Sequence, residues 1–196
     1  MREIVKLAIK LFVITAVAAI ALAFTNSITK DRIAEQLALE NELARQEVLK
    51  EAESFEQVDQ DEFVRIVEAL SIENPVMVEE SFKGLKDEDV VGYTYKVLPK
   101  GYGGEITLLV GISIDGEITG IKVVTHSETP GLGAKATEES FQRQFAGAST
   151  DSPLTVIKAG TPEDNQVQAI TGSTITTQAI TDGVNFAMEV FKEMDK

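Results

Sequence analysis

The segment Ala169–Thr177 (AITGSTITT) carries five hydroxyl side chains and a glycine directly before the last stretch with helical spacing. A helix N-terminus presents unpaired N–H groups and the positive end of the helix dipole, so it binds phosphate readily. Gly172 would let the backbone approach a phosphate closely, and Ser173 is too small to block it. An ordinary helix start also fits, with Thr174 as an N-cap that contributes about 1 kcal/mol. These residues alone leave both interpretations open.

The composition limits the chemistry elsewhere in the chain. Its 196 residues suffice for one domain and an appendage. The balance of 18 basic against 32 acidic residues, a net charge of −14, argues against nucleic acid as a partner. The absence of cysteine excludes disulfides, thiolate catalysis, cysteine-bound iron–sulfur clusters and a lipoprotein anchor. The single histidine, His126, cannot build a multi-histidine metal site, and we expect it to be structural.

An apolar run from Ile4 to Phe24 begins the chain. About 21 residues at about 1.5 Å each span about 31 Å as a helix, which matches a bilayer core. We therefore expect a transmembrane anchor over 1–26, and the basic residues Arg2, Lys6 and Lys10 place the N-terminus in the cytoplasm. A cleaved secretory signal, ending near Ala21-Leu22-Ala23, is the alternative. Both interpretations export the rest of the chain.

The remaining sequence predicts an α+β protein. A juxtamembrane helical segment is expected over 27–72, with helices at 29–55 and near 61–70. From 73 to 196 we expect a domain with a mainly antiparallel sheet packed by helices. Strands are predicted at 76–82 and 90–98 and in a hairpin over 105–125, whose turn is Asp115-Gly116.

The end of this domain has weaker signals before a strong one. The pattern predicts a helix near 137–145, a short strand at 154–158, a polar loop at 161–166 and a helix over 175–194 that packs one face on the sheet. No βαβ unit is visible, which argues against a Rossmann domain.

Three motifs behind the apolar run carry a family resemblance. GYGGEI (101–106), ETPGLGAK (128–135) and ITGSTITT (170–177) stand in this order and spacing. With them the chain resembles the G subunit of the Rnf complex, a relative of the C-type subunit of the sodium-pumping NADH:quinone oxidoreductase. The resemblance implies an electron-carrier subunit of a membrane-bound, ion-translocating ferredoxin:NAD oxidoreductase. Such a subunit has no stand-alone catalytic activity.

The resemblance also implies covalent FMN. In that family the last threonine of D-x-x-[ST]-G-A-T is joined to the FMN phosphate by a phosphodiester, which a separate flavin transferase installs. The matching residue is Thr174. The chain departs from the motif at Ser173, where the family has alanine, and at Gln168, where it has aspartate; Asp164, four residues before Gln168, is a possible substitute.

The implied cofactor site has two parts, and we expect no catalytic residue and no metal. In the loop 128–133, Gly131 and Gly133 permit positive φ, and Leu132 can face the isoalloxazine ring. A bare helix-entry loop is the alternative for these residues. The expected FMN-binding residues are Thr171, Gly172, Ser173, Thr174, Ile175, Thr176, Thr177, Glu128, Thr129, Pro130, Gly131, Leu132 and Gly133.

The expected location is the cell membrane, with a single pass and the flavin domain outside the cytoplasm. The partners are the lipid bilayer, the flavin transferase and the other membrane and peripheral subunits of the complex. Two alternative functions stay open: a C-type subunit of the quinone reductase and a cofactor-free, membrane-tethered binding module. The second predicts colourless protein of unmodified mass.

Overall fold

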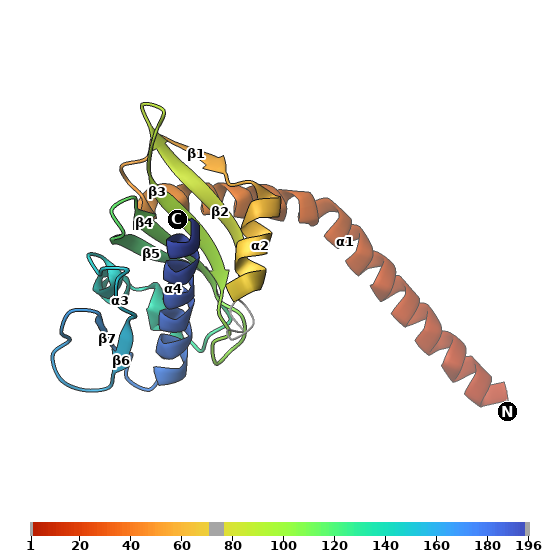
Figure 1. The fold of residues 1–196 in the computed structure, drawn as a ribbon. Coiled ribbons are helices and arrows are strands. Elements are labelled where there is room, and N and C mark those ends of the chain that lie inside the picture. The colour runs from red at the N-terminus through yellow and green to blue at the C-terminus, as the bar shows by residue number, and fades with distance from the viewer. Residues whose placement is uncertain (1, 71–76, 195–196) are drawn as a thin grey trace. The chain divides into compact units, whose positions relative to one another are not determined.

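The computed structural model describes residues 2–70 and 77–194. They divide into two compact units, Met1–Asn41 and Glu42–Lys196. The predicted boundary at 72/73 lies outside the described residues. The elements, coloured along the chain in Figure 1, are α1 (Arg2–Val48), β1 (Ser54–Gln57), α2 (Gln60–Leu70), β2 (Met77–Lys86), β3 (Asp89–Leu98), β4 (Thr107–Ser113), β5 (Ile118–Thr125), η1 (Gly133–Thr137), α3 (Glu139–Gln142), η2 (Arg143–Phe145), β6 (Thr155–Ile157), β7 (Gln166–Gln168) and α4 (Thr174–Met194).

The long helix α1 contains the apolar run. It is long and apolar enough to cross a membrane, and large apolar side chains from Ile4 to Phe24 are exposed on it. The helix ends at Val48, so the prediction of helix as far as residue 55 is wrong. A few residues later the backbone bonds to the sheet: Glu53 N donates to Leu85 O at 2.8 Å, and β1 then pairs with β2.

The second unit is built on a five-stranded sheet with the order β1-β2-β3-β4-β5, in which all neighbours are antiparallel. This confirms the α+β prediction. Gly116, in the turn between β4 and β5, has φ +79° as the hairpin predicts. A second sheet pairs β6 with β7 in parallel. The sequence predicted β6 but not β7, because β7 has a single valine between two glutamines and therefore resembles a polar loop.

One face of the large sheet holds the main core. The helix α4 packs on β3 and β4 and contacts α2 (Figure 1). The fully buried side chains of this core are Tyr95, Val97, Ile106, Leu108, Val110, Ile112, Ile118, Phe145, Val167, Ile180, Val184, Phe186, Ala187 and Val190. The predicted helix at 137–145 is instead the series η1, α3 and η2, in which Phe141 and Phe145 contact edge to face and are buried in the core.

Residues 44–52 cover the opposite face of the sheet. Leu49 is 1% exposed there. Backbone contacts bring this segment close, because a Cβ on Gly111 would lie 2.5 Å from Val48 O. The Thr119 hydroxyl also donates a hydrogen bond to Val48 O. The end of α1 thus belongs to the second unit and completes its packing.

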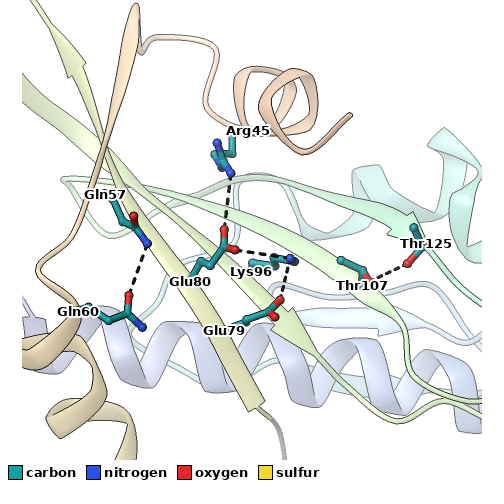
Figure 2. A network of polar contacts seen from close by, with 8 residues as sticks. All are labelled: Arg45, Gln57, Gln60, Glu79, Glu80, Lys96, Thr107 and Thr125. Carbon is teal, nitrogen blue, oxygen red and sulfur yellow. Dashed lines mark hydrogen bonds and ion pairs between the residues drawn. The ribbon is translucent and has the colours of Figure 1, made fainter. Parts of the chain in front are cut away.

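An ion pair fixes this segment to β2, and two further ion pairs join β2 to β3 (Figure 2). Arg45 lies 3.6 Å from Glu80 and 3.8 Å above the ring of Phe82. Lys96 contacts Glu79 at 2.7 Å and Glu80 at 3.7 Å. Desolvation lowers the pKa of the Arg45 guanidinium, and the neighbouring carboxylates, Glu80 first, offset part of this effect.

Candidate functional site

The start of α4 forms one wall of the site. The helix begins at Thr174, and Thr177 N donates to Ser173 O at 3.0 Å. The N-cap is therefore Ser173, and the interpretation of Thr174 as the cap is wrong by one position. Amide N–H groups in the first turn of a helix have no intrahelical acceptor. The turn before them needs Gly172, whose φ is +80°.

The loop 128–133 forms the opposite wall. Leu132 N and Ala134 N both donate to Thr129 O, at 3.1 and 3.2 Å, which closes a tight turn. Gly131 has the predicted positive φ, +77°. Gly133 begins η1 without a positive φ, and its lack of a side chain serves instead a close approach, since a Cβ there would lie 2.2 Å from Glu128 Oε2.

Glu128 links these walls to the loop 101–104. Its side chain is buried, and its Oε1 accepts a hydrogen bond from Gly103 N at 2.9 Å. Its Oε2 accepts one from Thr176 Oγ1 at 2.8 Å. His126 Nδ1 accepts a hydrogen bond from Glu128 N at 3.1 Å, which agrees with the structural role expected for the histidine.

A cavity of about 510 Å³ opens between the walls. Nine of the residues expected from the sequence line it: Glu128, Thr129, Leu132, Gly133, Gly172, Ser173, Thr174, Ile175 and Thr176. The tenth lining residue, Tyr102, was not expected, although it lies in the GYGGEI motif. The structure therefore brings both predicted segments to one cavity.

Four expected residues do not line this cavity. Pro130 and Gly131 are exposed at the tip of the loop. Thr177 is fully buried, and its Oγ1 accepts from Ile170 N and donates to Ser173 O, both at 3.1 Å. Thr171 is exposed and lines a different cavity, of about 460 Å³, together with Gln168 and Lys135.

The hydroxyl of Thr174 differs from those of Thr176 and Thr177, which follow it in the helix. Thr176 and Thr177 use theirs in the hydrogen bonds to Glu128 and Ser173. Within residues 2–70 and 77–194, Thr174 Oγ1 has no hydrogen-bond partner. Thr174 is half-buried and lines the cavity, so its hydroxyl is available there for a new bond.

Large apolar side chains surround the cavity. Tyr102 is 73% exposed, Ile175 59% and Leu132 44%. Exposed apolar residues are ordinary when they are scattered, but three of them around one cavity suit a flat apolar ligand. Across the described ranges, no group of three or more His, Asp or Glu side chains is arranged to hold a metal ion.

Gln168 and Asp164, the two residues considered for the aspartate of the motif, line different cavities. Gln168 is held through its backbone by Gln144, whose Oε1 accepts from Gln168 N at 2.8 Å. Asp164 lines another cavity, together with Gly147 and Asn165. Asp164 therefore does not line the cavity that contains Gln168.

The chain matches known protein families over most of its length. Residues 101–189 match the family described as the FMN-binding domain, and residues 1–58 match the RnfG N-terminal region. The chain is 46% identical to the G subunit of the Na(+)-translocating ferredoxin:NAD(+) oxidoreductase complex of Acetobacterium woodii, over 100% of this chain and 95% of the relative. It is 38% identical to the G subunit of the ion-translocating oxidoreductase complex of Methanosarcina acetivorans, over 96% and 94%.

The fold also matches a solved structure. The C-type subunit of the Na(+)-translocating NADH-quinone reductase from Parabacteroides distasonis superposes with a TM-score of 0.60 and 18% identity. The match covers 84% of this chain and 96% of that protein. At this identity the likeness establishes a common fold.

Proposed function

The chain belongs to the family of Rnf complex G subunits, and we propose that it carries FMN on Thr174 as an electron-transfer subunit of a membrane-bound, ion-translocating ferredoxin:NAD(+) oxidoreductase. Two relatives are named as G subunits of ion-translocating oxidoreductase complexes, and residues 101–189 match an FMN-binding domain. The flavin supplies the electron-transfer chemistry that amino-acid side chains lack. The chain supplies attachment, orientation and polarity.

The observation that carries the proposal is the position of the Thr174 hydroxyl. It lies at the first residue of a 21-residue helix, lines the cavity and has no hydrogen-bond partner among the described residues. A phosphate joined to this oxygen would lie beside the amide N–H groups of the first turn and the positive end of the helix dipole. Gly172 leaves room for it, because it has no side chain.

The remaining walls of the cavity suit the isoalloxazine ring. Small-molecule sites usually enclose about 300–1,000 Å³, and this cavity of about 510 Å³ lies in that range. Leu132, Ile175 and Tyr102 offer apolar surface to the ring, while the exposed rim of the cavity leaves it open to a redox partner.

Covalent attachment suits a domain outside the cytoplasm. Esterification removes one charge from the phosphate and holds the flavin at a high effective concentration, so the carrier does not lose it. The proposal assigns the formation of the bond to a separate flavin transferase. Gln168 and Ser173 are the two positions at which that enzyme meets residues different from the motif.

The helix α1 supports the proposed location. It is long and apolar enough to span the bilayer, and Arg2, Lys6 and Lys10 at its start favour a cytoplasmic N-terminus. The flavin domain then lies outside the cytoplasm. Because the chain has no cysteine, iron–sulfur clusters with cysteine ligands must come from partner subunits.

The test is the intact mass of the protein purified from its native membrane, followed by peptide mapping around Thr174. We expect an added mass equal to FMN on this peptide, its loss in Thr174→Ala and its retention in Thr161→Val, which changes an exposed threonine outside the motif and the cavity. An unmodified wild-type chain from a host with an active transferase would contradict the proposal and favour the cofactor-free, membrane-tethered module.

A further inference from the structure

Glu128 is a buried acidic residue in the wall of the cavity. It is 6% exposed, and both carboxylate oxygens accept hydrogen bonds, from Gly103 N and Thr176 Oγ1. Both oxygens of the side chain are therefore used as acceptors. The two donors are 25 and 48 residues away in sequence, so one side chain joins three separate segments.

Two glycines make the space for this carboxylate. A Cβ on Gly101 would lie 2.2 Å from Glu128 Oε1, and a Cβ on Gly133 would lie 2.2 Å from Oε2. Any larger residue at either position would displace the carboxylate. The loop 101–104 and the start of η1 therefore fit around this side chain, which indicates a built arrangement.

The charge of Glu128 has no cationic partner in the described part of the chain. Every ion pair found within residues 2–70 and 77–194 involves other carboxylates. Two neutral donors stabilise it instead. A fixed negative charge at a buried position acts strongly on a neighbouring group, because the effective dielectric constant there is far below that of water.

We propose that Glu128 is the positioning residue of the flavin site. It holds the loop 101–104 against the first turn of α4, which places Tyr102 and Thr174 on the same cavity. The second part of the inference rests on the proposed function: the negative charge of Glu128 lowers the reduction potential of the bound FMN. The negative charge of the reduced flavin is repelled by the carboxylate in the wall, which has no cationic partner among the described residues, so the oxidised form is favoured.

The positioning role is tested by hydrogen exchange on the full-length protein, with or without FMN. We expect the amides of the peptide 101–106 to exchange at least tenfold faster in Glu128→Ala. Glu128→Gln keeps an acceptor oxygen for Gly103, so its exchange should stay within twofold of the wild type. Glu105→Gln removes the same charge from an exposed side chain nearby and should leave the exchange of these amides unchanged.

A second variant covers the case in which Glu128→Ala does not fold. Thr176→Val removes the donor to Oε2 and keeps the carboxylate, so we expect faster exchange in the first turn of α4. Unchanged exchange in the folded variants, Glu128→Ala or Thr176→Val, would overturn the positioning role.

The charge effect is tested by the reduction potential of the FMN in protein whose mass shows the modification. We expect Glu128→Gln to shift the oxidised-to-reduced ratio at least tenfold towards the reduced form, a rise of about 30 mV for a two-electron couple. Glu105→Gln should leave the potential unchanged. Equal potentials in Glu128→Gln and the wild type would overturn the charge effect. A wild type without FMN would overturn the proposed function and the charge effect, and the exchange measurement alone would then decide the positioning role.

Discussion

The backbone N–H of Ile170 donates a hydrogen bond of 3.1 Å to Thr177 Oγ1, seven residues further along the chain. Through the same hydroxyl, Thr177 donates to Ser173 O at 3.1 Å. One fully buried side chain thus spans the turn that presents Thr174 to the cavity. Thr176 and Thr177 use their hydroxyls in the structure, whereas the hydroxyls of Thr171 and Thr174 make no hydrogen bond within the described residues, and of these two only Thr174 lines the cavity.

Replacing Thr177 with valine should lower stability. The variant keeps the shape of the side chain but leaves the Ile170 N–H without its acceptor, which costs about 1–3 kcal/mol. Urea unfolding followed by circular dichroism measures the loss. Thr174→Val is the matched control, since its hydroxyl makes no hydrogen bond to the described residues, and its stability should stay within about 0.5 kcal/mol. Equal stabilities of the two variants would contradict the structural role of Thr177.

The sequence predicted the central part of this fold well because its signals are long. The hairpin of β4 and β5 and the helix α4 repeat their apolar spacing over many residues. The strands β1 (SFEQ) and β7 (QVQ) are short and mostly polar, so they lack such a pattern and form only by pairing with β2 and β6.

The candidate site likewise has one part that the sequence could predict and another that it could not. The motifs indicated both walls of the cavity, since each is a continuous stretch of sequence. Glu128, however, is hydrogen-bonded to Gly103, 25 positions before it, and to Thr176, 48 positions after it. Only the folded chain brings these three residues together. Tyr102 was missed for the same reason, because its motif lies on a loop whose position depends on that linkage.

Replacing Gly172 with alanine should reduce the amount of attached FMN. Its φ of +80° costs an alanine about 1–2 kcal/mol, and the new Cβ would lie 3.2 Å from Leu132 Cδ2, across the cavity. We expect a lower modified fraction in the intact mass.

Gly131→Ala is the control for the effect of backbone strain on FMN attachment. Gly131 has a similar φ of +77°, but no heavy atom lies within 4 Å of the added Cβ. Its modified fraction should equal that of the wild type. A similar loss of FMN in both variants would indicate that backbone strain alone is responsible.

Replacing Arg45 with methionine should destabilise the second unit. The guanidinium lies 3.8 Å above the Phe82 ring and 3.6 Å from Glu80, and its side chain is 14% exposed. Loss of both contacts should cost about 1–3 kcal/mol in urea unfolding. Arg143→Met removes an ion pair whose side chains are 73% and 78% exposed, so it should cost less than about 1 kcal/mol. Equal losses would contradict a special contribution from Arg45.

Replacing Thr94 with valine should stabilise the protein. Thr94 is fully buried in β3, and its Oγ1 has no hydrogen-bond partner among the described residues. A buried hydroxyl without a partner carries an uncompensated desolvation cost, and valine has nearly the same shape and suits a strand. We expect a gain of about 1 kcal/mol in urea unfolding. In Thr107→Val the same change removes a hydroxyl that accepts from Thr125 Oγ1 at 2.7 Å (Figure 2), so no gain should follow. A loss of stability in Thr94→Val would mean that its hydroxyl makes a favourable interaction in solution.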